Sequence, residues 1–228
     1  MSSRALVFDY DGVLAEIGSE SPLPGIIRIL EELKDKYKIL IASTRSTEFL
    51  VKQVPVADGY IGICGLEILV EGMLIYPLKA LDKARSSQLN DLAGALKTSC
   101  LRVELKKNMM GWTMGLGISW RRCVGKPVDV IGVEEKAVEA GLYLFRYQRP
   151  FLEIYVAEAS KARGVSFVRR LLGLSWVSYF GDSESDMEVF PEVENPVFVR
   201  NEYNQHMSPG NVVEVRQGDL AGFLERLL

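Results

Sequence analysis

The strongest constraint on the fold is the alternation of short apolar runs with helical patterns at both ends of the 228-residue chain. Ala5–Phe8 is a continuous apolar run, typical of a strand that is buried on both faces. Apolar residues then recur at helical spacing between 26 and 33, and a second apolar run follows at 39–42. The same order returns with a helical pattern at 165–172 and a strand-like run at 176–180. This alternation predicts an α/β, Rossmann-like core built on a parallel sheet.

The segment between residues 79 and 157 has a different pattern. Its strand-like runs are joined by short loops, and the turn at Tyr147–Pro150 is typical of a hairpin. We therefore expect a core of residues 1–78 and 158–228 with an α+β module of residues 79–157 inserted into it. The expected elements of this αββαββ module are a helix at 81–96, strands at 101–105 and 112–120, a helix at 133–140, and strands at 142–146 and 151–156. In the core we expect further strands at 196–200 and 211–216 and a closing helix at 220–228.

Composition excludes several classes of function. With 48% hydrophobic residues, 25% charged residues and a formal net charge of -3, the chain is typical of globular proteins. Its basic residues are scattered and do not alternate with aromatic ones, so no nucleic-acid partner is expected. No apolar stretch approaches the roughly 18 residues of a membrane span. The N-terminus shows no signal peptide, which predicts a cytoplasmic protein, and no protein partner is indicated.

Cysteine and histidine usage restricts the chemistry. The three cysteines form no C-x-x-C pair and are odd in number, so we expect small buried side chains rather than a disulfide framework or a zinc site. The single histidine, His206, lies in a polar loop and is expected to be solvated. A serine or cysteine nucleophile usually needs a histidine base, and zinc enzymes usually need several imidazoles. These counts leave catalysis by carboxylate side chains as the expected chemistry.

The main chemical signal is the pair Asp9 and Asp11, which follows the first expected strand. A carboxylate can attack phosphorus when a cation screens its charge, so Asp9 is the expected nucleophile. The two side chains would point to opposite faces of a straight strand, so the chain must turn after Asp9, and Gly12 permits that turn. Asp11 could then protonate the leaving oxygen and later deprotonate the attacking water. A solvated Asp-Gly turn is the alternative interpretation of the same residues.

Three further pieces strengthen the functional interpretation. Ser43 follows the second strand and can donate a hydrogen bond to a phosphate oxygen, although it can also cap a helix. Lys161 opens a helix, where its ammonium could screen Asp9, although it can also be a surface lysine. Asp182 and Asp186 follow a later strand and could bind a hard cation, although this segment can also be a capped helix start. Ligation by oxygen alone favours magnesium over zinc.

In this order, the D-x-D-G start, the serine, the lysine and the G-D-x-x-x-D segment resemble the motifs of the haloacid dehalogenase (HAD) superfamily. The resemblance implies that Asp9 is the nucleophile and Asp11 the acid/base. It implies that Ser43, together with the adjacent Thr44, and Lys161 bind phosphate. It also implies a magnesium site made by Asp9, the backbone carbonyl of Asp11, Asp182 and Asp186. An aspartate at the second position is the mark of the superfamily's phosphatases and phosphomutases.

The inserted module looks like the cap of the superfamily's sugar phosphatases (subclass IIB), and it is most similar to that of trehalose-6-phosphate phosphatases. Residues 65–68, 103–106, 112–121 and 152–154 carry this finer resemblance. It implies that Glu104, Lys106 and Glu153 bind sugar hydroxyls, with Arg45 as a further substrate contact. The alternative for each of these side chains is an exposed charge on a sheet face.

The sequence thus predicts a magnesium-dependent phosphatase of a small phosphorylated sugar, with trehalose 6-phosphate as the specific candidate. A phosphohexomutase would return the phosphoryl group to the sugar, and a phosphoglycolate-type phosphatase would act on a smaller substrate. A phosphosugar-binding protein without turnover is the alternative from another class. It is disfavoured because the full set of acidic residues is present.

Overall fold

The computed structural model describes residues 3–228 and separates the chain into two compact units. The core unit comprises Met1–Ile75 and Ser160–Leu228, and the insertion comprises Tyr76–Ala159. The boundaries of the insertion lie a few residues outside the 79–157 expected from the sequence.

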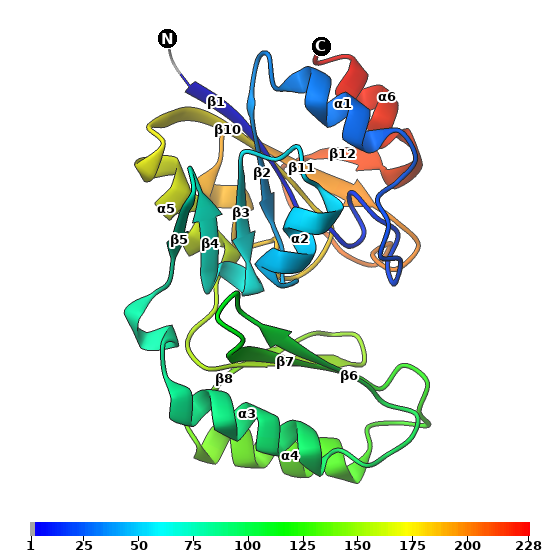
Figure 1. Cartoon of the computed structure of the whole chain (residues 1–228). Coiled ribbons are helices and arrows are strands. Elements are labelled where there is room, and N and C mark those ends of the chain that lie inside the picture. Colours follow the sequence, from blue (N-terminus) through cyan, green and yellow to red (C-terminus); the bar gives the residue numbers. More distant parts are fainter. Residues whose placement is uncertain (1–2) are drawn as a thin grey trace. The chain divides into compact units, whose positions relative to one another are not determined.

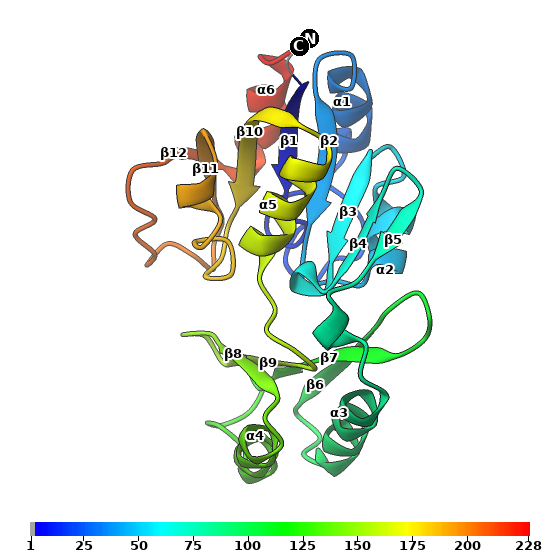
Figure 2. The ribbon, with the colours of Figure 1, turned by 90° about the vertical axis from the view of Figure 1, so that its left-hand side faces the viewer.

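The core unit is built on an eight-stranded sheet with the strand order β12-β11-β10-β1-β2-β3-β4-β5 (Figures 1 and 2). The strands from β12 to β3 are parallel to their neighbours, whereas β4 and β5 pair antiparallel at one edge. The predicted parallel core is confirmed, but the antiparallel edge of β4 and β5 is not among the strands expected from the sequence. The strands are β1 (Ser3–Phe8), β2 (Lys38–Ala42), β3 (Gly59–Gly62), β4 (Glu67–Val70), β5 (Met73–Ile75), β10 (Leu174–Gly181), β11 (Asn195–Arg200) and β12 (Val213–Arg216).

Helices cover both faces of this sheet because its central strands are apolar on both faces. Along β1, Leu6 and Phe8 belong to one hydrophobic cluster, whereas Ala5 and Val7 belong to the other. The first cluster also contains buried residues of α1 (Ile26–Leu33), α2 (Thr47–Gln53) and α6 (Leu220–Glu225). The second contains those of α5 (Lys161–Leu171). Figure 2 shows α5 and α1 on opposite faces of the sheet.

The insertion is a four-stranded antiparallel sheet, ordered β6-β7-β9-β8, with two helices on one face (Figure 1). Leu89 and Val133, from the two helices, and Leu116 and Ile154, from the strands, are buried. The order of elements is the predicted αββαββ, although the second helix begins at Val128, earlier than expected. The elements are α3 (Lys83–Ala95), β6 (Arg102–Lys107), β7 (Thr113–Ser119), α4 (Val128–Glu139), β8 (Tyr143–Arg146) and β9 (Phe151–Tyr155). Among residues 3–228, no helix is both long enough and apolar enough to span a membrane.

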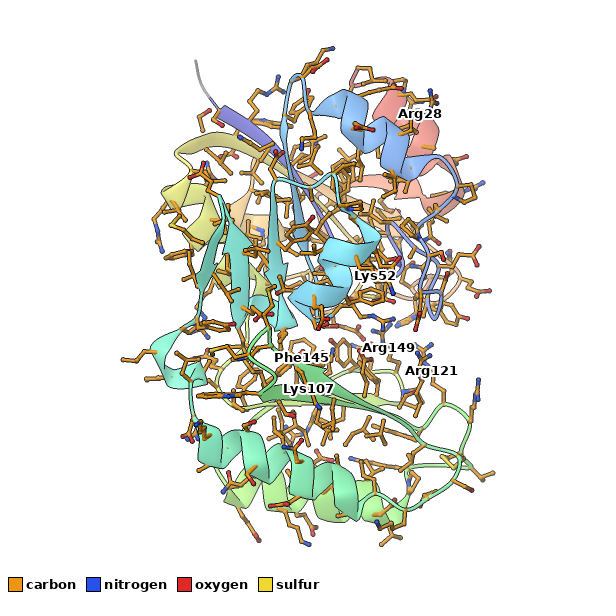
Figure 3. The ribbon with its side chains drawn as sticks, in the orientation of Figure 1. Arg28, Lys52, Lys107, Arg121, Phe145 and Arg149 are labelled. Atoms are coloured by element: carbon orange, nitrogen blue, oxygen red, sulfur yellow. A yellow bond between two sulfur atoms is a disulfide. The ribbon has the colours of Figure 1, made fainter. Side chains whose placement is uncertain are left out.

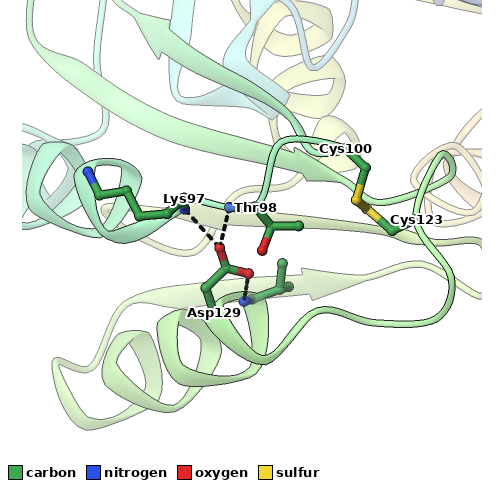
Figure 4. Close-up of a disulfide and its surroundings, with 6 residues drawn as sticks. Lys97, Thr98, Cys100, Cys123 and Asp129 are labelled. Carbon is green, nitrogen blue, oxygen red and sulfur yellow. Dashed lines mark hydrogen bonds between the residues drawn. A yellow bond between two sulfur atoms is a disulfide. The ribbon is translucent and has the colours of Figure 1, made fainter.

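Two of the three cysteines form a disulfide, so the expectation of three unpaired buried thiols was wrong. Cys100 and Cys123 are bonded with their Cα atoms 5.4 Å apart (Figure 4). Cys64 is buried, as expected, and takes part in no disulfide. The two cysteines flank the hairpin of β6 and β7, whose antiparallel register brings its ends together. The Asp129 carboxylate accepts hydrogen bonds from the backbone N–H groups of residues 97 and 98, which fixes the segment that leads to Cys100. Spacing in the sequence does not reveal this proximity.

We expect this disulfide to stabilise the protein by about 3 kcal/mol, because it closes a loop of just over twenty residues in the unfolded chain. The double variant Cys100→Ser/Cys123→Ser should therefore unfold at a lower denaturant concentration than the parent. Dithiothreitol should destabilise the parent and leave the double variant unchanged. Equal midpoints for the parent and the double variant under non-reducing conditions would contradict the expectation.

Candidate active site

Three of the predicted site residues lie side by side at one edge of the core sheet. Asp9 directly follows β1, Ser43 follows β2 and Asp182 follows β10. The parallel register pairs Phe8 with both Ile41 and Phe180, so these three strands end at the same level. All three polar side chains are buried. The structure therefore brings together the residues that the sequence placed at strand ends.

Lys161 is fully buried at the start of α5, which excludes the alternative of a surface lysine. Its Nζ lies 2.9 Å from Oδ2 of Asp9 and 2.7 Å from Oδ1 of Asp186. Burial lowers the pKa of Lys161, but the two carboxylates outweigh it, and the net shift is upward. The backbone at Gly65 lies close to the start of this helix. Only glycine allows this contact, because a Cβ at residue 65 would lie 2.3 Å from the carbonyl oxygen of Ser160.

Asp186 anchors the site through both of its carboxylate oxygens. Oδ1 accepts hydrogen bonds from Lys161 and, at 2.6 Å, from the hydroxyl of Tyr179. Oδ2 accepts from the backbone N–H groups of Asp182 and Ser183 and from the Ser183 hydroxyl, at 2.9 to 3.1 Å. Burial would raise the pKa of Asp186, but Lys161 and these donors hold it below its usual range. Five donors fill the roughly four lone-pair positions of a carboxylate, so direct metal ligation by Asp186 would have to displace one.

A cation bound beside Asp9 would change the protonation of its carboxyl group. Burial raises the pKa of Asp9 to about 7, against the opposing effect of Lys161. Oxygen atoms of Asp9, Asp182 and Asp186 all lie within 4.8 Å of one another. A cluster of carboxylate oxygens suits a hard divalent cation, which would also favour the ionised form of Asp9. The residues present therefore fit a divalent metal site.

The chain turns after Asp9 as the sequence predicts, and Gly12 adopts the left-handed φ of 81°. Asp11 then meets Arg45, whose Nε and Nη2 donate hydrogen bonds of 2.8 and 2.7 Å to its two carboxylate oxygens. The Arg45 guanidinium also lies over the Phe49 ring, 4.9 Å from its centroid. Arg45 follows β2 together with Ser43 and Thr44, so it belongs to the core unit.

Asn201, which was not predicted from the sequence, connects two parts of the site. Its side-chain amide donates hydrogen bonds to Oδ2 of Asp182, at 2.7 Å, and to the carbonyl oxygen of Gly12, at 3.3 Å. The amide of Asn204 also donates to the backbone oxygen of Asp182, at 2.9 Å. A signal was present, because Asn201 directly follows the predicted strand at 196–200. The strand-end argument that identified Asp9 applies to it equally.

In the insertion, two of the three predicted sugar contacts form a buried ion pair. Lys106 Nζ contacts Oε1 of Glu153, and the hydroxyl of Tyr147 donates a 2.6 Å hydrogen bond to Oε2. Both charged side chains are buried, so they are not exposed charges on a sheet face. Gly117 of β7 pairs with Glu104 of β6 on one side and with Glu153 of β9 on the other. The ion pair of Lys106 and Glu153 crosses β7 at this glycine, where a Cβ would lie 3.6 Å from Lys106 Cε. Glu104 is half-buried.

No protein-family model matches this sequence, and no curated protein matches it. Solved structures match the fold over almost the whole chain. One is described as a trehalose-6-phosphate phosphatase related protein, with 17% identity, a TM-score of 0.74, and coverage of 98% of this chain and 96% of that one. The C-terminal domain of trehalose-6-phosphate phosphatase from C. albicans has 18% identity and a TM-score of 0.74, with coverage of 99% and 92%.

A third match is a HAD subclass IIB sugar phosphatase, with 15% identity, a TM-score of 0.69, and coverage of 99% of this chain and 100% of that one. At these identities the likeness concerns the fold. It includes the strand ends at which Asp9, Ser43 and Asp182 lie and the inserted αββαββ module. This chain therefore has the fold of the HAD-superfamily phosphatases, as the motifs in its sequence predict.

Proposed function

We propose that this protein is a magnesium-dependent phosphatase that hydrolyses a phosphorylated sugar through an aspartyl-phosphate on Asp9. The observation that carries the proposal is the buried arrangement in which Lys161 bridges Asp9 and Asp186 beside Asp182. A carboxylate held next to one fixed ammonium, at the edge of the sheet where α/β folds bind ligands, is equipped to attack a phosphate ester.

In the first step, an oxygen of Asp9 forms a bond to phosphorus while the bond from phosphorus to the sugar oxygen breaks. Asp11 gives the departing oxygen its proton. In the second step, water attacks the aspartyl-phosphate, Asp11 takes the proton from that water, and inorganic phosphate leaves. Lys161, Ser43 and Thr44 bind the phosphate oxygens during both steps, and the fixed ammonium screens the charge of Asp9 from that of the phosphate.

Arg45 restricts when Asp11 can act as an acid. Both oxygens of Asp11 accept hydrogen bonds from Arg45. To donate a proton, Asp11 must be protonated, and one of its oxygens then has to turn toward the leaving group. Arg45 must therefore release at least one of its two bonds when substrate binds. The released guanidinium N–H groups would then be available to the substrate, which supports the predicted contact by Arg45.

We propose that Asp9, Asp182 and the backbone carbonyl of Asp11 hold Mg²⁺, with Asp186 fixing Lys161 and the turn at residue 182. The five donors to Asp186 support this division of roles. Oxygen ligands and a phosphate partner suit Mg²⁺ among the common divalent cations. When bound, the ion neutralises charge on the phosphate and on Asp9.

For the substrate we propose a sugar phosphate, with trehalose 6-phosphate as the specific candidate. The half-buried Glu104 of the inserted module supports a polyol ligand, since carboxylates accept hydrogen bonds from hydroxyls, whereas the buried pair of Lys106 and Glu153 would have to open to contact one. Two of the similar structures are described as trehalose-6-phosphate phosphatase or related to it. Products separate the alternatives: a mutase would yield an isomeric sugar phosphate, a phosphoglycolate-type enzyme would prefer the small acid, and a binding protein would release no phosphate.

A cytoplasmic location remains part of this proposal. The disulfide agrees with it if the protein belongs to a hyperthermophile, whose intracellular proteins often carry disulfides. In other organisms such a bond indicates an oxidising compartment.

Asp9→Asn should lower phosphate release by at least about a thousandfold, because it removes the nucleophile at almost constant volume. The assay is phosphate release from a panel of sugar phosphates and phosphoglycolate with Mg²⁺ present. Thermal unfolding should show that the variant is folded, and Asp91→Asn, at an exposed position in α3, is the matched control. Near-normal turnover by Asp9→Asn would contradict the proposed mechanism.

Removal of divalent cations should stop turnover, and added Mg²⁺ should restore it. Asp182→Asn should shift the concentration of Mg²⁺ that gives half-maximal activity upward by about tenfold or more, because it removes a charged ligand. Titration of the chelator-treated protein with Mg²⁺ measures both effects. Full activity of thoroughly chelated protein would show that no metal is required.

Asn201→Ala should weaken Mg²⁺ binding by about ten- to a hundredfold, because the Asp182 carboxylate loses the amide that orients it. Calorimetric titration of the metal-free protein measures this affinity without reference to turnover. Asn211→Ala, in an exposed position, provides the control. If Asn201→Ala binds Mg²⁺ as tightly as the parent, then Asn201 has no positioning role.

A further inference from the structure

The insertion contains an arginine that lacks an acceptor. Arg149 lies in the turn between β8 and β9, and its Nε is buried without a hydrogen-bond partner. Among the described residues of the insertion, none forms a hydrogen bond or an ion pair with its guanidinium. By contrast, Arg146 in the same hairpin pairs with Glu134. A guanidinium carries five N–H donors, and an unpaired buried donor such as the Nε–H of Arg149 is costly, so Arg149 is placed to receive an acceptor from outside the insertion.

Aromatic rings hold this guanidinium in place. Its Cζ lies 4.8 Å from the ring centroid of Tyr147 and 5.6 Å from that of Phe151. The Tyr147 ring packs against Phe151 and Phe145, with centroids 5.0 and 4.7 Å away. Figure 3 shows Phe145 and Arg149 on the side of the four-stranded sheet opposite α3 and α4. Stacking on rings fixes the plane of a guanidinium while its N–H edges stay available for hydrogen bonds.

The surroundings of Arg149 favour an anion as the acceptor. The nearby carboxylate of Glu153 is already neutralised by Lys106 and accepts a hydrogen bond from Tyr147, so it is not a counter-ion for Arg149. The insertion as a whole contains thirteen lysines and arginines against nine aspartates and glutamates. This excess of positive charge attracts negatively charged ligands.

We propose that Arg149, held on Tyr147 and Phe151, is a binding site for a carboxylate or phosphate group. Both groups have two oxygens at the spacing of the guanidinium fork, which makes a bidentate contact possible. The group has two possible sources: a second acidic group on the phosphorylated substrate, or a separate small anion. Only the first source rests on the proposed phosphatase function.

The test uses the full chain carrying Asp9→Asn, so that ligands are bound without turnover. Calorimetry compares glucose 6-phosphate with 6-phosphogluconate, which has a similar carbon skeleton but carries an additional carboxylate, and it also titrates inorganic sulfate. Each titration is repeated with Arg149→Met, which removes the donors, with Arg149→Lys, which keeps the charge but not the fork, and with the control Arg146→Met. Thermal unfolding verifies that every variant is folded.

If the substrate supplies the acid group, 6-phosphogluconate should bind about tenfold or more tighter than glucose 6-phosphate. Arg149→Met should abolish this preference, Arg149→Lys should retain part of it, and Arg146→Met should leave it unchanged. If a separate anion binds, Arg149→Met should instead eliminate one sulfate site while the two sugar phosphates bind alike. Equal titrations for the parent and Arg149→Met with all three ligands would overturn the proposal. These experiments measure binding and not turnover. A protein without phosphatase activity would therefore contradict the proposed function, but it would not show whether Arg149 binds an anion.

Discussion

The structure of the core unit depends on one buried interaction, the contact of Lys161 with both Asp9 and Asp186. Taking three charged groups out of water is costly, and it is tolerated only where each charge has a close partner. The ammonium therefore has to lie between the two carboxylates, which requires α5 to begin next to the ends of β1 and β10. The glycines at 65 and 164 allow this approach, since a Cβ at either position would collide with neighbouring atoms.

Much of this site could be predicted from sequence because strand ends are a one-dimensional signal. An apolar run that stops at a polar residue marks the edge of a parallel sheet, so the sequence alone groups Asp9, Ser43 and Asp182 at one edge. What the sequence did not reveal depends on the direction of side chains. The five donors to Asp186 and the contact of Asn201 with Asp182 follow from loop geometry, which no periodicity encodes.

The insertion shows the same limit in a different form. Its order of helices and strands follows from local patterns, but the burial of Lys106 and Glu153 is a tertiary property. The disulfide is another such property, because Cys100 and Cys123 meet only through the pairing of β6 with β7. Rules based on the spacing of cysteines consider only their separation along the sequence, so they do not detect two cysteines that a hairpin brings together.

The balance of charge in the site gives a physical reason for the proposed metal dependence. Four carboxylates, those of Asp9, Asp11, Asp182 and Asp186, meet in the described part of this site, and two cations, Lys161 and Arg45, form ion pairs with them. A phosphate dianion would enter a site that is already negative, and at these distances in a partly buried site the repulsion is several kcal/mol per pair of charges. A divalent cation among the carboxylates would offset the excess, which gives a physical reason for the proposed metal site to adjoin the proposed nucleophile.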